Sequence, residues 1–217
     1  MMRRRDLELE RDDPRSATAS PLPPGVSDEN PKDVGLLELL AEDFATHGSK
    51  VTPGFVALAV HRLGNWRMGV RSPVLRAPLT AAYRVAYHSV IAALGIDLPY
   101  NVKLGRRVRF DHHGCIVMGA WSVGDDVIVR GPATIGLARP DGRRAPIIGN
   151  RVEIGPRACV GGGIRVGDDA FVGPATVLTE DLPAGATALG NPCRQVDLDK
   201  LLAPAVRAPS RPPKARA

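Results

Sequence analysis

The sequence has few aromatic residues, few cysteines and no long apolar run. Only 4% of its 217 residues are aromatic, which leaves little to stack on nucleic-acid bases, and it carries no helix-turn-helix or RNA-binding signature. Its three cysteines show no Cys-x-x-Cys spacing, so neither a disulfide framework nor a metal site is predicted. The most apolar stretch, Leu79 to Leu98, is interrupted by Arg84, His88 and Asp97 and is too polar to span a bilayer. We therefore expect a cytoplasmic protein with neither a nucleic-acid nor a membrane partner.

The two ends of the chain differ in composition from its middle. Residues 1–33 are rich in charge, proline and serine and have almost no large apolar side chains, which predicts disorder. Residues 197–217 form a C-terminal tail whose last part, PAVRAPSRPPKARA, is proline-rich and basic. Part of the net charge of +6 lies in these ends, which argues against a nucleic-acid groove. A phosphorylated small ligand suits the charge equally well.

An aliphatic residue recurs every six positions through the second half of the chain. The hexads begin at Leu104, Phe110, Ile116, Val123, Val129, Ile135, Ile148, Ile154, Val160, Val166, Val172 and Leu178. Glycine often follows the aliphatic residue, and a small or β-branched residue usually lies four positions after it. Neither the helical period nor strand alternation gives this spacing. A hexapeptide β-helix does, because each hexad forms one short side of a triangular coil.

The repeat predicts an α+β architecture. Residues 34–97 would form a helical region, and residues 98–196 would form a parallel β-helix of about four coils, since three sides make one coil. The segment LARPDGRRAP, residues 137–146, interrupts the repeat after a one-residue slip earlier in the series. We expect it to form a surface loop, where functional residues tend to lie.

Three helices are predicted upstream of the repeat. The first spans residues 34–48 and ends at a glycine, the second begins at Thr52 and Pro53 as N-cap and first residue, and the third runs from Leu79 to Leu94 and ends at Gly95. The expected apolar face of the first is Leu36, Leu37, Leu40 and Phe44, and that of the second is Phe55, Leu58, Ala59 and Leu63.

The helices and hexads together resemble the serine acetyltransferases. The stretches that carry the likeness are GFVALAVHRLGNW (54–66), FDHHGCIVMG (110–119), VGDDVIVRGPATIG (123–136), IIGNRVEIGPRACVGG (147–162) and VGPATVLTEDLPAGATALGNPCR (172–194). The likeness covers about residues 34–196, with a helical region of the compact type. It implies a left-handed parallel β-helix, a homotrimer or dimer of trimers, and acetyl transfer from acetyl-CoA to the hydroxyl of L-serine in cysteine biosynthesis.

The resemblance also implies roles for the Asp-His-His motif. His112 matches the family's general base, Asp111 matches a carboxylate that binds the acceptor, and Asp97 is the ungapped match of the aspartate that pairs with the base. A neutral imidazole with a pKa near ~6.5 suits this task, because a neighbouring carboxylate fixes its tautomer and stabilises the imidazolium. His113 is the alternative base and an acceptor-binding candidate; adjacent residues on a strand face opposite ways, so we expect only one histidine in the site. Two surface histidines on an early coil remain the other interpretation.

The sequence departs from the family at the acceptor side. Arg144 stands where the family has the arginine that binds the serine carboxylate, but Ala145 replaces the histidine of its Arg-His-Pro turn. Ala120 stands where the family has the glutamate that pairs with this histidine. An altered acceptor site leaves two alternatives open: a sugar, polysaccharide or natural-product O-acetyltransferase, and a non-catalytic CoA-binding scaffold.

The acetyl-CoA end is expected to lie along adjacent coils. CoA needs backbone N–H and C=O groups for its pantetheine amides and positive charge for its phosphates. The residues expected to form this slot and to contact the phosphates are Gly136, Gly155, Arg157, Ala158, Gly173, Thr176 and Arg194. In the family the slot lies between neighbouring subunits of a trimer, and the resemblance implies the same here, with no metal.

Overall fold

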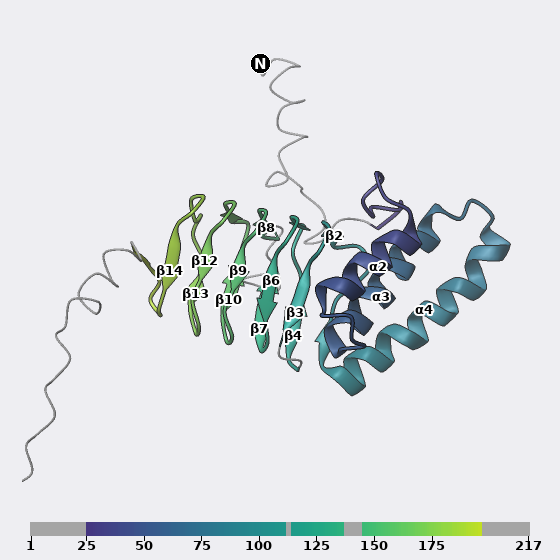
Figure 1. The fold of residues 1–217 in the computed structure, drawn as a ribbon, viewed down its shortest axis with the longest axis horizontal. Coiled ribbons are helices and arrows are strands. Elements are labelled where there is room, and N and C mark those ends of the chain that lie inside the picture. Colours follow the sequence, from purple (N-terminus) through teal and green to yellow (C-terminus); the bar gives the residue numbers. More distant parts are fainter. Residues whose placement is uncertain (1–24, 112–113, 137–144, 197–217) are drawn as a thin grey trace, which may run out of the picture.

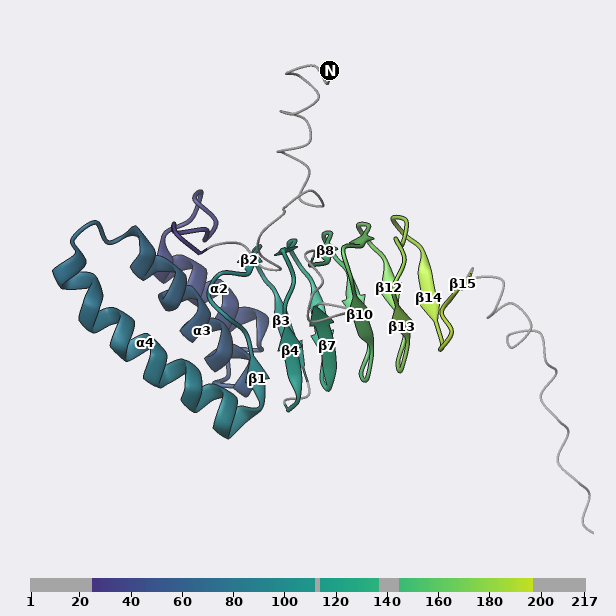
Figure 2. The ribbon, with the colours of Figure 1, turned by 180° about the vertical axis from the view of Figure 1, so that it is seen from behind.

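A three-helix region followed by a β-solenoid of about four turns confirms the predicted architecture. The structure is a computed structural model, and it describes residues 25–111, 114–136 and 145–196. The helices gather at one end of the solenoid, and the coils stack away from them toward β14 (Figure 1). The longest helix, α4 (Pro73–Leu94), runs beside α3 (Pro53–Trp66) and ends at the first strand, β1 (Ile96–Asp97) (Figure 2). Within the described ranges, no helix has the length and apolar character needed to cross a membrane.

The helices begin and end largely at the predicted signals. They are α2 (Leu36–Thr46), α3 (Pro53–Trp66), the short 3-10 helix η2 (Arg67–Gly69) and α4 (Pro73–Leu94). The Thr52 hydroxyl accepts a hydrogen bond from the Phe55 N–H at 3.2 Å, so Thr52 caps α3 as predicted. Gly95 ends α4 in the left-handed conformation, with φ of 64°. The helix begins at Pro73, ahead of the predicted Leu79, because proline is favourable at the first position of a helix.

The buried faces of α2 and α3 differ from the predicted ones. Leu39 and Asp43 are the buried residues of α2, whereas Leu37 is 82% exposed. In α3 the buried face includes Arg62, while Leu63 is 46% exposed. The predicted faces are therefore only partly correct: Leu58 is fully buried as predicted, but an acid in α2 and a base in α3 occupy buried positions that apolar periodicity does not indicate.

Arg62 and Asp43 form a fully buried ion pair that fastens the helices to the first coil. The Arg62 Nε donates to Asp43 Oδ2 at 3.0 Å, and both side chains are fully buried. Its two terminal nitrogens donate to the carbonyls of Leu104 and Gly105, at 3.0 and 2.6 Å. One guanidinium therefore links α2, α3 and β2 by charge-assisted hydrogen bonds.

His61, the neighbour of Arg62 on α3, is buried as a neutral imidazole. Its Nε2 donates to the Val102 carbonyl at 2.9 Å, and its side chain is almost without solvent contact. Burial, with a further contribution from the Arg62 charge, lowers the pKa of His61 to about 3. The folded protein therefore holds this ring uncharged at any pH at which it is handled in practice.

We expect the free energy of unfolding to fall as the pH drops below about 6.5, the pKa of histidine in an unfolded chain. The unfolded chain binds a proton there that folded His61 binds only near pH 3, so acid favours unfolding. This one group contributes a slope of up to about 1.4 kcal/mol per pH unit over that window. Urea unfolding between pH 7 and 5 measures it. The matched control is His61→Gln, which keeps a side-chain N–H donor and should show a shallower slope; equal slopes would contradict the assignment.

Residues 25–33 pack against the protein, although the sequence predicted disorder there. The Glu29 N–H donates to Asn65 Oδ1 at 2.9 Å, and the Asn30 side-chain amide donates to the Arg62 carbonyl at 3.0 Å. Lys103 Nζ lies 3.6 Å from Glu29 Oε2. The segment is held by polar contacts with α3 and the first coil, which composition alone does not reveal.

Three sheets form the solenoid, and each takes every third strand. The β1 sheet contains β1 (Ile96–Asp97), β4 (Ile116–Met118), β7 (Ala133–Gly136), β10 (Cys159–Gly161) and β13 (Val177–Leu178). The β2 sheet contains β2 (Lys103–Leu104), β5 (Ser122–Val123), β8 (Ile147–Ile148) and β11 (Arg165–Val166). The β3 sheet contains β3 (Arg109–Asp111), β6 (Ile128–Arg130), β9 (Glu153–Ile154), β12 (Phe171–Val172) and β14 (Thr187–Leu189), closed by the antiparallel β15 (Arg194–Val196). The solenoid thus begins at Ile96, two residues before the predicted boundary.

The hexad pattern forms the core of the solenoid. All twelve aliphatic residues are buried, none more than 4% exposed, and the small residues four positions after them are buried as well. They stack in columns: Leu104, Val123, Ile148 and Val166 align in one sheet, and Phe110, Val129, Ile154 and Val172 in another. Removing these side chains from water is the main stabilisation of such a fold.

One corner of the solenoid carries a column of alternating charge. Arg107, Asp126, Arg151 and Asp169 occupy the same turn on successive coils, each in the left-handed conformation with φ between 53° and 59°. Arg107 Nε lies 2.6 Å from Asp126 Oδ1, and Arg151 Nε lies 2.6 Å from Asp169 Oδ1. We refer to these four residues as the corner column.

Candidate functional site

The corner between β3 and β4 is longer than the matching corners above it. Ile135 lies six positions after Val129, and the same spacing holds on the next two coils. Met118, the residue aligned with Ile135, lies eight positions after Phe110. The sequence pattern assigned this place to Ile116, but Ile116 aligns with Ala133. The chain therefore has two more residues at this corner than at the matching corners, and this is the corner that contains the Asp-His-His motif.

The described residues that follow the motif lie against the segment that leads into Asp97. Asp111 ends β3, and the Ile116 N–H that follows the motif donates to the Gly95 carbonyl at 3.0 Å. A Cβ added to Gly95 would lie 3.0 Å from the Cys115 nitrogen, so the two segments touch. His112, His113 and Arg144 themselves lie outside the described residues. The structure thus brings Cys115 and Ile116, which follow the motif, against Gly95, two positions before Asp97.

Asp97 has a hydrogen-bond donor that the sequence did not indicate. The Tyr87 hydroxyl, on α4, donates to Asp97 Oδ1, and both side chains are partly buried. Burial, and then the hydrogen bond to Asp97, raise the pKa of Tyr87, so the phenol stays protonated and keeps donating. No sequence motif joins a helical tyrosine to an aspartate ten positions later, and so only the fold reveals the contact.

Asp111 borders a cleft of about 410 Å³ between the α2–α3 connection and β3. Arg109 and Asp111 point outward from β3 on either side of the inward Phe110, and Arg109 Nε lies 2.6 Å from Asp111 Oδ1. The full lining is His47, Lys50, Val51, Thr52, Pro53, Gly54, Arg109, Phe110 and Asp111. Its charged groups and its position beside the Asp-His-His corner make it the candidate acceptor cleft.

His47 fixes the rear of this cleft and is uncharged. Its Nδ1 donates to the Asp43 carbonyl at 2.7 Å, and its Nε2 accepts from the Phe110 N–H at 3.3 Å, an arrangement that requires the neutral ring. Gly54 lies so close that an added Cβ would sit 2.4 Å from the Phe110 carbonyl oxygen. The cleft wall is therefore set by packing and cannot accept a larger residue at position 54.

The two positions that depart from the family pattern are buried. Ala120 has no exposed surface and Ala145 is 6% exposed. The resemblance implies an acid and an imidazole at these positions, so the altered acceptor site stays a prediction.

The predicted CoA-binding positions lie on adjacent coils, but several of their groups serve the solenoid itself. The Gly155 and Gly173 N–H groups donate to carbonyls of the next coil at 2.7 and 2.9 Å. Ala158 and Thr176 point into the buried interior, and the Thr176 hydroxyl accepts from the Gly190 N–H at 3.0 Å. Gly136 is also buried, and its carbonyl accepts from the next coil.

Two sets of side chains face outward around the predicted CoA-binding positions: two arginines and a row on the outer face of the β1 sheet. Arg157 and Arg194 are exposed. Thr134, Cys159 and Val177 lie in register on the outer face of the β1 sheet and form a strip of small side chains that the sequence analysis missed. The acetyl-CoA slot therefore stays a prediction.

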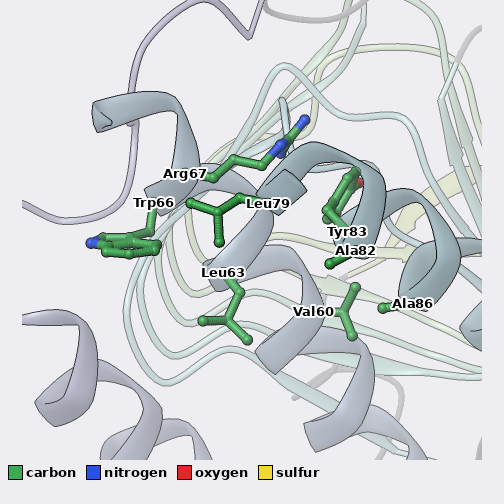
Figure 3. Close-up of a pocket in the computed structure, with 8 residues that line it drawn as sticks. All are labelled: Val60, Leu63, Trp66, Arg67, Leu79, Ala82, Tyr83 and Ala86. Atoms are coloured by element: carbon green, nitrogen blue, oxygen red, sulfur yellow. The ribbon is translucent and has the colours of Figure 1, made fainter. Parts of the chain in front are cut away.

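A separate apolar pocket of about 200 Å³ lies between α3 and α4 (Figure 3). Leu63, Trp66 and Leu79 line it, together with Arg67 and Tyr83. The Arg67 guanidinium lies 4.2 Å from the centroid of the Tyr83 ring. The lining offers no acid–base pair, so this pocket is not the candidate active site.

Comparison with known proteins finds serine acetyltransferases and hexapeptide-repeat transferases. The family model "Bacterial transferase hexapeptide (six repeats)" matches residues 145–180. A serine acetyltransferase of Synechococcus elongatus is 30% identical over 146 residues, covering 66% of this chain and 57% of the relative. One of Helicobacter pylori is 38% identical over 108 residues, covering 49% of this chain and 63% of the relative. The solved serine acetyltransferase of Vibrio cholerae matches with a TM-score of 0.62 at 26% identity, covering 74% and 65% of the two chains.

The chain belongs to the serine acetyltransferase family of hexapeptide-repeat transferases. It spans less than two thirds of the length of the two curated relatives, 57% and 63%.

Proposed function

We propose that the protein transfers the acetyl group of acetyl-CoA to a hydroxyl, with L-serine as the first acceptor to test. The observation that supports this proposal is the corner between β3 and β4, which has two more residues than the matching corners and whose described end lies against Gly95, two positions before Asp97. Family membership supplies the donor and the reaction class. The cleft bordered by Asp111 supplies room for an acceptor next to the motif.

The reaction would proceed by direct attack. His112 takes the proton of the acceptor hydroxyl while the oxygen attacks the thioester carbonyl carbon of acetyl-CoA, and Asp97 stabilises the imidazolium that forms. The carbonyl oxygen carries the negative charge of the intermediate, which backbone N–H groups stabilise. The C–S bond then breaks, and the CoA thiolate receives the proton from His112 as it leaves. All atoms balance without a metal or a redox partner.

A thiol-release assay tests the function. The purified protein is mixed with acetyl-CoA and L-serine, free CoA is followed with a thiol reagent, and the acetylated product is identified by mass spectrometry. Turnover that depends on both protein and L-serine supports the proposal. Absence of turnover with L-serine, sugars and hydroxylated natural products alike, combined with measurable CoA binding, would instead identify a CoA-binding scaffold.

Sugar hydroxyls are the second class of acceptor, favoured by a specific feature of the cleft. Asp111, the proposed acceptor-binding carboxylate, is already paired with Arg109, and so its charge is less available to an amino-acid ammonium group. Ala120 and Ala145 likewise remove polar groups from the acceptor side. Higher kcat/KM for a monosaccharide than for L-serine in the same assay would select this class.

We also propose a homotrimer, or a pair of trimers, with the acetyl-CoA slot between subunits. Light scattering of the purified chain measures the assembly. A monomer that turns over acetyl-CoA would exclude a slot shared between subunits.

A further inference from the structure

We propose that Tyr87 is a positioning residue for the acetyl-transfer reaction: by donating its hydroxyl to Asp97, it fixes which carboxylate oxygen meets the catalytic histidine. This inference rests on the proposed function, because it assigns Asp97 the task of orienting His112. The contact itself is a property of the fold. Tyr87 lies on α4, ten residues before Asp97, and outside every stretch that carries the family resemblance.

The location of Asp97 makes an external support necessary. Asp97 ends the two-residue strand β1, whose other residue, Ile96, is fully buried, so the aspartate side chain points out of the solenoid. An outward carboxylate on a short strand has several rotamers available. The Tyr87 hydroxyl selects one of them by donating to Oδ1, which leaves Oδ2 for a second donor.

Tyr87 is itself held rigidly by a stack of side chains. Its ring lies nearly parallel to that of Tyr83, with 5.6 Å between the centroids and 16° between the planes. Tyr83 is packed edge-on against Tyr100 at 5.4 Å, and the Arg67 guanidinium lies 4.2 Å from both of these rings. Figure 3 shows Arg67 and Tyr83 at the start of this stack, on the rim of the apolar pocket. The helical region therefore reaches the proposed active site through Tyr87.

The electrostatic consequence follows from the direction of the hydrogen bond. A phenol that donates to a carboxylate withdraws part of its negative charge and reduces its attraction for a neighbouring imidazolium. The titratable groups packed around Tyr87 in the described part of the chain are Asp97, Tyr83 and His88, whose ring centroid lies 5.5 Å from that of Tyr87. Tyr87 thus orients Asp97 and keeps the pKa of the histidine base from rising too far above the working pH.

The test is Tyr87→Phe, which keeps the ring and removes the hydroxyl. We expect the pKa of His112 to rise by roughly 0.3–1 unit, since the Asp97 charge is no longer shared. The NMR titration of the His112 imidazole, assigned by its absence from the spectrum of His112→Gln, measures this without any turnover. With L-serine and acetyl-CoA at pH 7, kcat/KM should fall about three- to tenfold, and the acid limb of its pH profile should move up with the imidazole pKa.

Two comparisons separate positioning from a merely structural role. Tyr100→Phe is the matched control, because it removes a tyrosine hydroxyl from the same stack, bonded only to the Gly25 carbonyl at 3.2 Å, and leaves Asp97 untouched. It should leave the His112 pKa unchanged. In an Asp97→Asn background, Tyr87→Phe should add less than a twofold further loss, since the group it acts through is no longer charged.

The outcomes for this inference and for the proposed function are distinct. A His112 pKa that stays within 0.1 unit of the wild-type value in Tyr87→Phe, about the precision of the titration, overturns the positioning role, whatever the activity. Equal losses of kcat/KM with and without the Asp97 carboxylate also overturn it. A rise of the His112 pKa in Tyr87→Phe, combined with wild-type protein that acetylates neither L-serine nor any other hydroxyl, contradicts the proposed function and leaves the Tyr87–Asp97 coupling demonstrated.

Discussion

Replacing His112 with alanine is expected to lower kcat/KM for acetyl transfer by about 10²–10⁴-fold, the usual effect of losing a general base. The acceptor hydroxyl would then have to lose its proton to water as it attacks the thioester. The structure contributes to this expectation the long corner that carries the motif and the contact between its far end and the segment before Asp97. The thiol-release assay measures the rate, and the circular-dichroism spectrum checks that the variant remains folded.

His113→Ala is the matched control, because it alters the neighbouring ring on the same corner. We expect it to retain activity within about threefold of wild type, since the sequence predicts that only one of the two adjacent histidines faces the site. A loss of less than threefold in His112→Ala, with a large loss in His113→Ala, would move the role of base to His113. Small losses in both would mean that neither histidine is the base.

Arg62→Met is expected to lower the free energy of unfolding by about 3–5 kcal/mol, the cost of breaking a buried ion pair by removing one partner. The substitution strands the Asp43 carboxylate without its cation in a site that has no solvent contact. It also leaves the Leu104 and Gly105 carbonyls without their guanidinium donors. Methionine retains most of the side-chain volume, so the loss reports charge and hydrogen bonds more than a cavity. Equilibrium urea unfolding at pH 7 measures it.

Two further variants distinguish this explanation from a general sensitivity to arginine loss. Arg151→Met removes an exposed ion pair with Asp169 and should leave the unfolding midpoint almost unchanged. Combining Arg62→Met with Asp43→Leu removes both buried charges and should recover a substantial part of the lost stability. A double variant no more stable than Arg62→Met would show that the desolvated carboxylate is not the main cost.

The solenoid was predictable because its stabilisation is periodic. Each hexad places one aliphatic side chain in the interior, and the six-residue spacing from Leu104 to Leu178 follows from that requirement. The helical region was less predictable, because Asp43, His61 and Arg62 satisfy one another only after the chain has folded. Hydrophobic periodicity cannot register a buried face that is stabilised by paired charges and by backbone carbonyls from a distant coil.

Some residues of the candidate site were likewise predictable from the sequence, and others were not. Asp111 and His112 were predicted from a local motif and Asp97 from its ungapped match to the family, whereas the two additional residues at the corner after β3 appeared in the sequence only as a slip in the repeat. Tyr87 and Arg109 were missed, since each acts through a contact that the sequence spacing does not encode. Residues that contact the proposed catalytic groups are brought to the site by tertiary packing, whereas the proposed catalytic groups themselves belong to a recognisable sequence pattern.

The corner column limits how this solenoid can change in length. Because arginine and aspartate alternate from Arg107 to Asp169, deleting the coil that carries Asp126 would set Arg107 directly against Arg151. Removing or duplicating two consecutive coils would instead preserve the alternation of sign. Because these side chains are exposed, the repulsion would cost at most about 1 kcal/mol, so a change of two coils avoids only a small electrostatic penalty at this edge of the triangle.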